Sequence, residues 1–196
     1  MWLADYSGKS DFICAIQQTG SDGKVAGISG NVDINTCYKE YSDMDESNVI
    51  PSPYKFNPQI TYQVKIQEKS WLPVVKNLNN YAGWNDIPIT DVAIKVSEGS
   101  IKYRVHVLGG RWLDYVTGFN TGDAKNGYAG NGHPIDAIEV YYFTPKGKTI
   151  HKAKYRIAPT NGSYFPWQYD NEHSNGQDGY AGVFGKRIGK FQIVLE

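Results

Sequence analysis

The chain has 196 residues, and its 20 Lys and Arg residues balance its 20 Asp and Glu residues, so the formal net charge is zero. This balance gives no reason to expect binding to nucleic acid or to an anionic membrane. The N-terminus lacks a cationic segment followed by an apolar core, and no apolar run is long enough to span a bilayer. Cys14 and Cys37 do not suggest a disulfide framework, which indicates synthesis in a reducing compartment.

The first 41 residues differ in character from the rest of the chain. Short apolar strands are predicted at residues 2–6 and 12–18, followed by a turn at residues 20–23. Residues 25–35 are predicted to be a loop and a short strand.

The residues of this segment carry a resemblance. Three of its segments resemble the last part of the family 25 glycoside hydrolases, the lysozyme-type muramidases: the tryptophan-containing strand at residues 2–6, Ile16-Gln-Gln-Thr19, and a glycine-rich closing motif from Gly23 to Asn35. That family has an aromatic Trp-Gln-Tyr-Thr where this chain has residues 16–19, a departure at a strand end that faces substrate. The resemblance implies that residues 1–41 are the remnant of a muramidase catalytic domain, a partial barrel tail. Because two barrel strands cannot close a barrel or cover its edges, we expect this remnant to be poorly ordered or re-packed.

No catalytic residue is predicted. A glycosidase needs two carboxylates placed as acid and as nucleophile or base. In the resembling family these lie on earlier barrel strands, and the matching segments here contain only Asp5 and Asp33. We therefore expect this chain alone not to be an enzyme, whereas its parent would be a muramidase that hydrolyses peptidoglycan.

Residues 42–60 are predicted to be an extended linker, because they are rich in acidic residues, serine and proline. Residues 61–196 are predicted to be a repeat domain. Tyr-Ala-Gly tripeptides begin at Tyr81, Tyr128 and Tyr180, a period of roughly 47–52 residues that is typical of repeat architectures.

Each repeat contains strand patterns and glycine turns. In the second repeat, Tyr103, Val105 and Val107 alternate with Arg104 and His106, which predicts a strand with one buried face. A glycine turn follows, and Trp112 and Val116 are predicted to lie on a second strand. The pattern at residues 135–140 predicts a strand buried on both faces. We predict an all-β fold of three tandem repeats of antiparallel strands, at about residues 61–97, 101–145 and 153–196, with a trefoil-like arrangement as the alternative.

The repeat half also resembles a known family. Segments such as Asn126-Gly-Tyr-Ala-Gly-Asn-Gly132, residues 135–142 and Asn175-Gly-Gln-Asp-Gly-Tyr-Ala-Gly182 are similar to the target-recognition domain of zoocin A and related streptococcal lysins. The resemblance implies binding to the peptidoglycan of Gram-positive cell walls. Together with the muramidase-like tail, it indicates the C-terminal part of a phage endolysin.

Aromatic side chains in glycine- and asparagine-rich loops are the candidates for wall binding, because they combine rigid apolar area with polar tips. The candidates are Trp84, Tyr115, Phe119, Tyr128, Tyr164, Trp167, Tyr169 and Tyr180. The competing interpretation is that aromatics recurring in every repeat, namely Trp71, Trp112 and the three Tyr-Ala-Gly tyrosines, belong to the core. We expect the second and third repeats to carry most of the affinity, since the short loop before Tyr81 leaves little backbone to shape a pocket.

No metal or cofactor is predicted. The four histidines, His106, His133, His151 and His173, are scattered and have no ligand spacing typical of zinc. The oxygen-rich loops lack the spaced ligands of a calcium site, and ordinary turn chemistry explains them.

The sequence therefore predicts a non-catalytic targeting region that binds the Gram-positive cell wall. The alternative is a separately translated oligomerisation subunit that assembles with itself or with the full-length lysin and raises avidity. Met1 falls inside the muramidase-like region, so the chain is expected to be an internal-start product or a piece of a longer lysin. We expect synthesis in the host cytoplasm without a signal peptide, and action at the bacterial wall after release.

Overall fold

The computed structural model describes residues 2–4, 16–37 and 56–196, and they contain strands and no helix. The chain divides into two compact units, Met1–Lys55 and Phe56–Glu196. Residues 42–55 of the predicted linker lie outside the described residues, and residues 56–60 belong to the second unit. The predicted all-β class is confirmed for the described residues.

The first unit contains a three-stranded sheet in the order β1 (Trp2–Ala4), β2 (Ile16–Gly23) and β3 (Val32–Cys37). β1 pairs with β2 in parallel, and β2 pairs with β3 in antiparallel fashion. The turn predicted at residues 20–23 is wrong, because β2 continues to Gly23 with two irregularities in its register. Gly27 and Gly30, both with positive φ, lie in the segment that turns the chain instead. Of the second strand predicted at residues 12–18, residues 16–18 lie in β2, whereas residues 12–15 are outside the described part, as are Asp5 and Tyr6.

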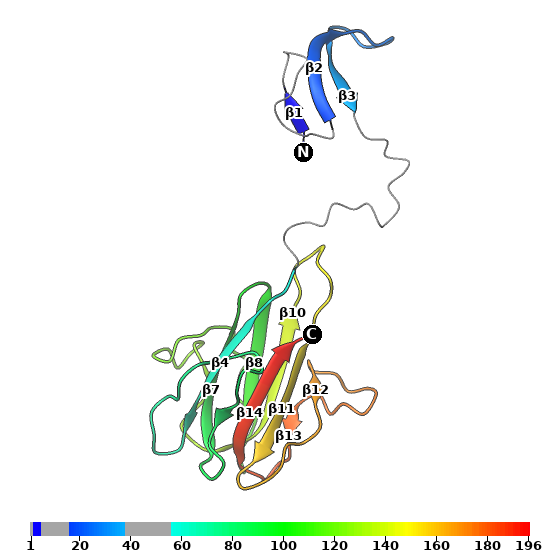
Figure 1. Ribbon diagram of the computed structural model, residues 1–196. Coiled ribbons are helices and arrows are strands. Elements are labelled where there is room, and N and C mark those ends of the chain that lie inside the picture. The colour runs from blue at the N-terminus through cyan, green and yellow to red at the C-terminus, as the bar shows by residue number, and fades with distance from the viewer. Residues whose placement is uncertain (1, 5–15, 38–55) are drawn as a thin grey trace. The chain divides into compact units, whose positions relative to one another are not determined.

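The second unit is built from three sheets, each with one long antiparallel hairpin (Figure 1). The long strands are β4 (Ile60–Ile66) with β7 (Ile89–Val96), β8 (Ser100–Val107) with β10 (Ile135–Phe143), and β11 (Ala153–Pro159) with β14 (Ile188–Leu195). The short strands are β5 (Val75–Lys76), β6 (Ala82–Gly83), β9 (Ala129–Gly130), β12 (Gln168–Tyr169) and β13 (Ala181–Gly182). We call the sheets first (β5-β4-β7-β9), second (β13-β10-β8) and third (β12-β11-β14-β6).

The three Ala-Gly strands connect the sheets. β6 pairs with β14 of the third sheet, β9 with β7 of the first, and β13 with β10 of the second. Each therefore lies in the connection between the two long strands of one hairpin and pairs with a strand of another sheet. Gly83, Gly130 and Gly182 have positive φ, and a Cβ at each would overlap the backbone carbonyl oxygen of Gly189, Thr90 or Asp136, respectively. This close approach is the physical reason for glycine in all three Tyr-Ala-Gly tripeptides.

The core lies between the sheets. Tyr62, Tyr103 and Tyr155 are completely buried at equivalent places on β4, β8 and β11. The hydroxyl of each donates a hydrogen bond to a backbone carbonyl, that of Asn77, Gly118 or Asp170, respectively. Isoleucines from all three sheets, with Val92 and Phe191, surround the middle of this core. The prediction that residues 135–140 are buried on both faces is confirmed.

One predicted strand is much reduced. Trp112 and Val116 were expected on a second strand of the middle repeat, but they form only isolated bridges, to His106 and Tyr103. Their segment follows β8 closely enough for Leu113 N–H to donate to the Val105 carbonyl. The segment still places the rings of Trp112 and Tyr115 against Arg104 of β8.

Candidate functional site

A row of alternating cations and aromatic rings lies on the outer face of the third sheet. Tyr155 and Ile157 point into the core, so Arg156 between them points outward. The segment after β11 runs back along it, with Phe165 N–H donating to the Ile157 carbonyl at 2.9 Å. This return places Tyr164 and Trp167 against the Arg156 guanidinium, whose Cζ lies 4.2 Å and 4.1 Å from the two ring centroids.

The row continues at both ends. Lys154 Nζ lies 5.4 Å from the Trp167 ring centroid and 5.5 Å from that of Tyr169. Lys154 also pairs with Glu196 at 2.8 Å, and the Glu196 hydrogen bond raises the pKa of the ammonium. At the other end, Lys190 Nζ lies 5.5 Å from the Tyr164 ring centroid. We call these residues, Lys154, Arg156, Tyr164, Trp167, Tyr169 and Lys190, the third-sheet row.

The second sheet carries a similar row. Arg104 Cζ lies 4.8 Å from the Trp112 ring centroid and 4.4 Å from that of Tyr115, and Lys102 lies 4.6 Å from the Tyr115 ring. The residues that surround it differ, because Glu139 on β10 accepts hydrogen bonds from Arg104 Nε at 2.7 Å and Nη2 at 2.6 Å. The Tyr115 hydroxyl donates to the other oxygen of Glu139, and burial together with this carboxylate raises the pKa of Tyr115 to about 12.

The first sheet has no such row. Tyr62 pairs with Val75 as Tyr103 does with Val116 and Tyr155 with Gln168. By this register, Gln63 stands where the other sheets have Arg104 and Arg156, and Val74 stands where they have Tyr115 and Trp167. The two rows are therefore features of the second and third sheets.

Aromatic pairs lie where two of the Tyr-Ala-Gly segments meet the sheets that they join. Trp71 packs edge-to-face with Tyr128 at 5.3 Å between centroids, and Trp112 with Tyr180 at 5.5 Å. Tyr180 also stacks on Phe184, whose ring lies 4.3 Å from that of His106. Phe184 is exposed, and the other rings are half-buried rather than part of the fully buried core.

Histidine 106 has a structural partner at this junction. Its Nδ1 lies 2.6 Å from Oδ1 of Asp136, which is fully buried, and Asp136 Oδ2 accepts the Gly185 N–H. The ring thus ties the second sheet to the segment after β13. His106 is therefore hydrogen-bonded to a buried carboxylate within the fold.

A cleft of about 460 Å³ opens beside Tyr81, lined by residues 72–76 and 79–84. Three of its apolar side chains are well exposed: Val74 at 57%, Tyr81 at 40% and Trp84 at 44%. The expectation that this short loop leaves little backbone to shape a pocket is therefore wrong, because the turn around Asn79 and Asn80 and the crossing of β6 to the third sheet form its walls. The core placement considered for Tyr81 is wrong as well.

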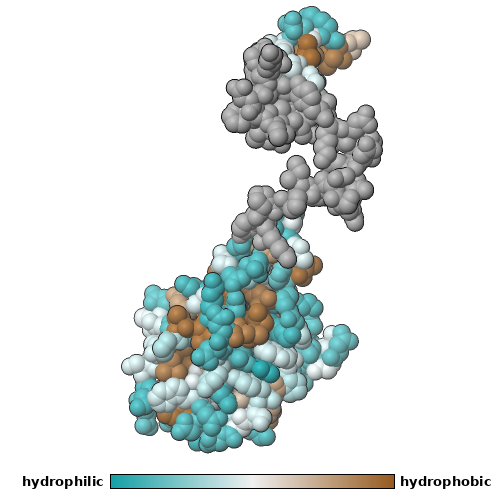
Figure 2. All heavy atoms as spheres, in the orientation of Figure 1, coloured by the Kyte–Doolittle hydropathy of each residue, from teal (hydrophilic) through white to brown (hydrophobic). Residues whose placement is uncertain are grey.

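The cleft and the third-sheet row adjoin each other. β6, which lines the cleft, is the edge strand of the third sheet. Lys190 Nζ lies 5.8 Å from the Tyr81 ring centroid, and Gln192 Nε2 donates to the Asn80 carbonyl at 3.5 Å. We call the cleft together with the third-sheet row the composite face. In Figure 2 apolar patches alternate with hydrophilic areas on the visible face of the second unit.

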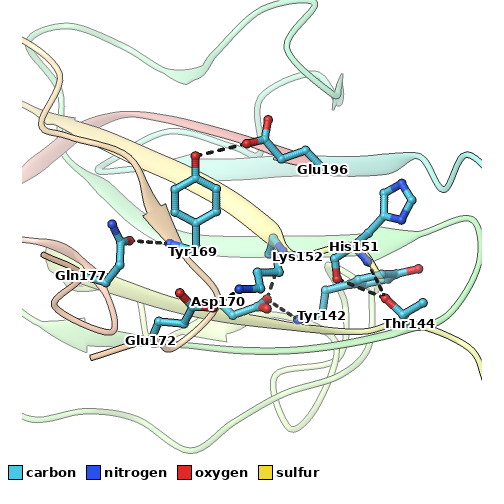
Figure 3. Close-up of polar contacts among 10 residues, drawn as sticks. Tyr142, Thr144, His151, Lys152, Tyr169, Asp170, Glu172, Gln177 and Glu196 are labelled. Atoms are coloured by element: carbon cyan, nitrogen blue, oxygen red, sulfur yellow. Dashed lines mark hydrogen bonds and ion pairs between the residues drawn. The ribbon is translucent and has the colours of Figure 1, made fainter. Parts of the chain in front are cut away.

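A second, polar cluster joins β10 to β11 (Figure 3). Asp170 is only 6% exposed, and its Oδ1 accepts the backbone N–H groups of Tyr142 and Ala153, each at 3.0 Å. Burial raises the pKa of Asp170. Beside it, the Lys152 ammonium pairs with Glu172. A cleft of about 370 Å³ lies next to this cluster, but the bonds of Asp170 go to backbone groups, so its role is to hold the two strands together.

The structure gathers only some of the predicted site residues. Tyr164, Trp167 and Tyr169 lie together on the third-sheet row, and Trp84 lies in the adjoining cleft. The others are spread over separate places: Tyr115 on the second sheet, Tyr128 and Tyr180 at the junctions, and Phe119 beside Lys95 at 4.8 Å.

The sequence reasoning did not identify the cations that pack on these rings. Arg104, Arg156 and Lys190 were not candidates, although each aligns with aromatics across the sheet. The available signal was the outward half of the strand alternation, Lys-x-Arg at residues 102–104 and again at 154–156, each followed by an aromatic segment.

Within the described residues, no group of three or more His, Cys, Asp or Glu side chains is placed to hold a metal ion. The same part of the chain has no helix of the length and apolarity that crossing a bilayer requires. Comparisons of the chain with models of protein families, with curated proteins and with solved structures found no match.

Proposed function

We propose that this chain is the non-catalytic, wall-binding region of a muramidase-type lysin and that it binds Gram-positive peptidoglycan through the composite face. The observation that carries the proposal is the set of exposed rings of Tyr81 and Trp84 around a cleft, beside the cation-stacked Trp167. Peptidoglycan offers sugar rings with apolar faces and peptides with amides, amines and carboxylates. Aromatic faces, asparagine amides and cations in one surface suit all of these groups.

The three-sheet organisation supports a repeat origin. Each sheet has one long hairpin, one returning segment and one Ala-Gly strand received from another repeat. We propose that the three units are tandem repeats arranged around a pseudo-threefold axis, in a trefoil-like manner. On this view the repeats share a scaffold and differ in the side chains that they present outward.

The first unit supports the muramidase part of the proposal in one respect. β1 and β2 pair in parallel, as neighbouring strands of an α/β barrel do, and β2 carries the residues that resemble the family's last barrel strand. Since the carboxylates of that family lie on earlier strands, the proposed role of this chain is binding without hydrolysis.

A sedimentation assay with purified Gram-positive walls tests the proposal. The full chain should co-sediment with the walls and should not clear a suspension of susceptible cells. Trp84→Ala should reduce co-sedimentation, while Val183→Ala, at an exposed position outside the cleft, serves as the matched surface control. Absence of wall binding by the intact chain, or clearing at rates comparable with a lysozyme, contradicts the proposal.

A further inference from the structure

The third-sheet row contains a guanidinium whose partner carries no charge. Arg156 Nε and Nη2 donate to Gln192 Oε1 at 3.0 Å and 2.8 Å. No carboxylate pairs with Arg156 among the described residues. A guanidinium has five N–H donors, so those not directed at Gln192 remain available on its outer edge.

The second-sheet row shows what a charged partner does in the equivalent position. Glu139 pairs with Arg104 through one oxygen, in the same Nε and Nη2 geometry, and its other oxygen accepts the Tyr115 hydroxyl. The Glu139 side chain is only 7% exposed, so this carboxylate is part of the folded sheet. The second sheet thus contains its own anion, bound between an arginine and a phenol.

Two further groups beside Arg156 have no anionic partner in the part of the chain that the structure describes. Lys190 bonds to the neutral Asn85 Oδ1 at 3.1 Å and lies over the Tyr164 ring, which also packs on Arg156. The Tyr164 hydroxyl is buried and has no hydrogen-bond partner in the described part of the chain. A buried hydroxyl without a partner is uncommon in a folded protein and calls for a water or a ligand that supplies one.

We infer that the third sheet binds an oxyanion, a carboxylate or a phosphate group, through Lys190 and through the Arg156 N–H donors that are not directed at Gln192. The inference rests on the proposed function for the source of the anion, because walls offer both peptide carboxylates and polymer phosphates. Arginine recognises both through paired N–H donors, and lysine adds a point charge. Tyr164 contributes its hydroxyl, and the neighbouring cleft would receive the apolar part of the same ligand.

Gln192 is the residue that keeps the site open. As an amide it accepts from Arg156 through its oxygen and donates to the Asn80 carbonyl through its nitrogen. A carboxylate at this position would neutralise Arg156 and could not donate to Asn80. The glutamine therefore fixes the arginine without consuming its charge.

The test follows the side-chain Nε–Hε signals of Arg156 and Arg104 by NMR in the full-length chain. The probes are N-acetyl-D-alanyl-D-alanine, with its C-terminal amide as control, and glycerol 3-phosphate, with glycerol as control. We expect the Arg156 signal to shift with at least one anion and with neither neutral control, while Arg104 stays in place. Which anion acts identifies carboxylate or phosphate as the source.

Two reciprocal variants sharpen the result. Gln192→Glu should weaken the response of Arg156 by about tenfold or more, because the introduced carboxylate competes for the guanidinium. Glu139→Gln should make Arg104 respond in turn, since it reproduces the partner found on the third sheet. If Gln192→Glu does not fold, Lys190→Gln, at a half-buried surface position, is the second test and should also weaken the response of Arg156 to the anion.

The outcomes separate this inference from the proposed function. If Arg156 does not respond to either anion at tens of millimolar, or responds equally to the neutral controls, the anion site is wrong even when the chain binds walls. If Arg156 responds to an anion but the chain does not bind walls, the site stands and the proposed function is wrong.

Discussion

The second and third sheets share a scaffold and use it differently. Arg104 and Arg156 occupy equivalent places and stack on equivalent aromatic segments, yet one is neutralised by Glu139 and the other is held by Gln192. The second sheet has thus closed its outer face with an internal ion pair, whereas the third leaves a cation at the surface beside a cleft. The difference teaches that cation–aromatic stacking alone does not mark a binding site; the charge of the arginine's partner decides.

The largest effect should test what the two sheets share, their buried tyrosines. Burial raises the pKa values of Tyr103 and Tyr155, and of Tyr62 in the first sheet, above the ordinary value of 10.0. In such a case the folded state holds its proton more tightly than the unfolded state, so stability is complete below about pH 10 and falls as pH rises towards the folded pKa. Each tyrosine should contribute a slope of about 1.4 kcal/mol per pH unit.

Denaturant unfolding between about pH 9 and pH 12 measures this slope, with tyrosinate absorbance as a second readout. Tyr103→Phe and Tyr155→Phe should each lower the slope by a similar amount, because both hydroxyls are buried and donate to a backbone carbonyl. Titration of these tyrosines in the folded chain near pH 10, without loss of structure, is the contrary result.

The second effect is a difference in stability loss between matched arginine variants of the second and third sheets. Arg104→Met removes the partner of a nearly buried carboxylate. We expect a loss of about 2–4 kcal/mol in the free energy of unfolding at neutral pH. This is less than the full cost of breaking a buried pair, because the Arg104 side chain is itself 30% exposed. Arg156→Met leaves the neutral Gln192 amide and should cost only about 1 kcal/mol. Thermal and urea denaturation of the two matched variants checks this, and equal losses would remove the distinction drawn between the rows.

The third effect concerns wall binding. Trp167→Ala should weaken wall binding by about 1–3 kcal/mol, as expected for an aromatic anchor, since Trp167 lies on the composite face. Tyr115→Ala is the matched control on the second sheet and should leave wall binding unchanged while it destabilises the fold through Glu139. Binding isotherms on purified walls, paired with melting curves, distinguish the two. Loss of several kcal/mol of stability in Trp167→Ala, without a binding defect in the remaining folded protein, would place Trp167 in the core instead.

The smallest effect should be a change in the free energy of unfolding at acidic pH. Asp170 stands where the second sheet has Gly118, and burial raises the pKa of its carboxyl. For an acid with a raised pKa, the folded state is favoured while both states are protonated and loses stability as pH rises from the unfolded value, about 4, through the folded one. Asp170→Asn keeps an oxygen that accepts from the Tyr142 and Ala153 N–H groups but cannot ionise. The free energy of unfolding of the variant should therefore rise relative to that of the wild type as pH increases over this range. If the stability of the wild type instead rises relative to that of the variant, the pKa of Asp170 is not raised in the folded state.

Much of the fold followed from local pattern. The alternation at residues 101–107 predicted β8 (Ser100–Val107), and the apolar run at residues 135–140 predicted a strand buried on both faces, as β10 is. Strand alternation is visible in sequence because it depends only on which face of one strand is buried. The prediction of a turn at residues 20–23 was wrong, because an irregular strand can contain glycines. Only the pairing of β2 with β3 shows that this segment is a strand.

Less of the candidate site could be predicted. Aromatic content pointed to Trp167 and Tyr164, which do lie together, but the arginine between them and the cleft beside Tyr81 were missed. Loop length was a poor guide to the cleft, since its wall is β6, a strand that belongs to another sheet. A pocket formed by segments distant in sequence leaves no sign in the length of any one loop.

The sequence by itself determined the all-β class, the strand alternation and the three glycines that the Tyr-Ala-Gly crossings require. The tertiary structure alone decided which sheet each crossing joins, and hence that Tyr81 and Lys190 share one surface. It also decided that Arg104 meets Glu139 while Arg156 meets Gln192. Alternation is a property of one strand, whereas a side chain's partner depends on the register between two strands. Arg104 and Glu139 are 35 residues apart in the sequence, and Arg156 and Gln192 are 36 residues apart.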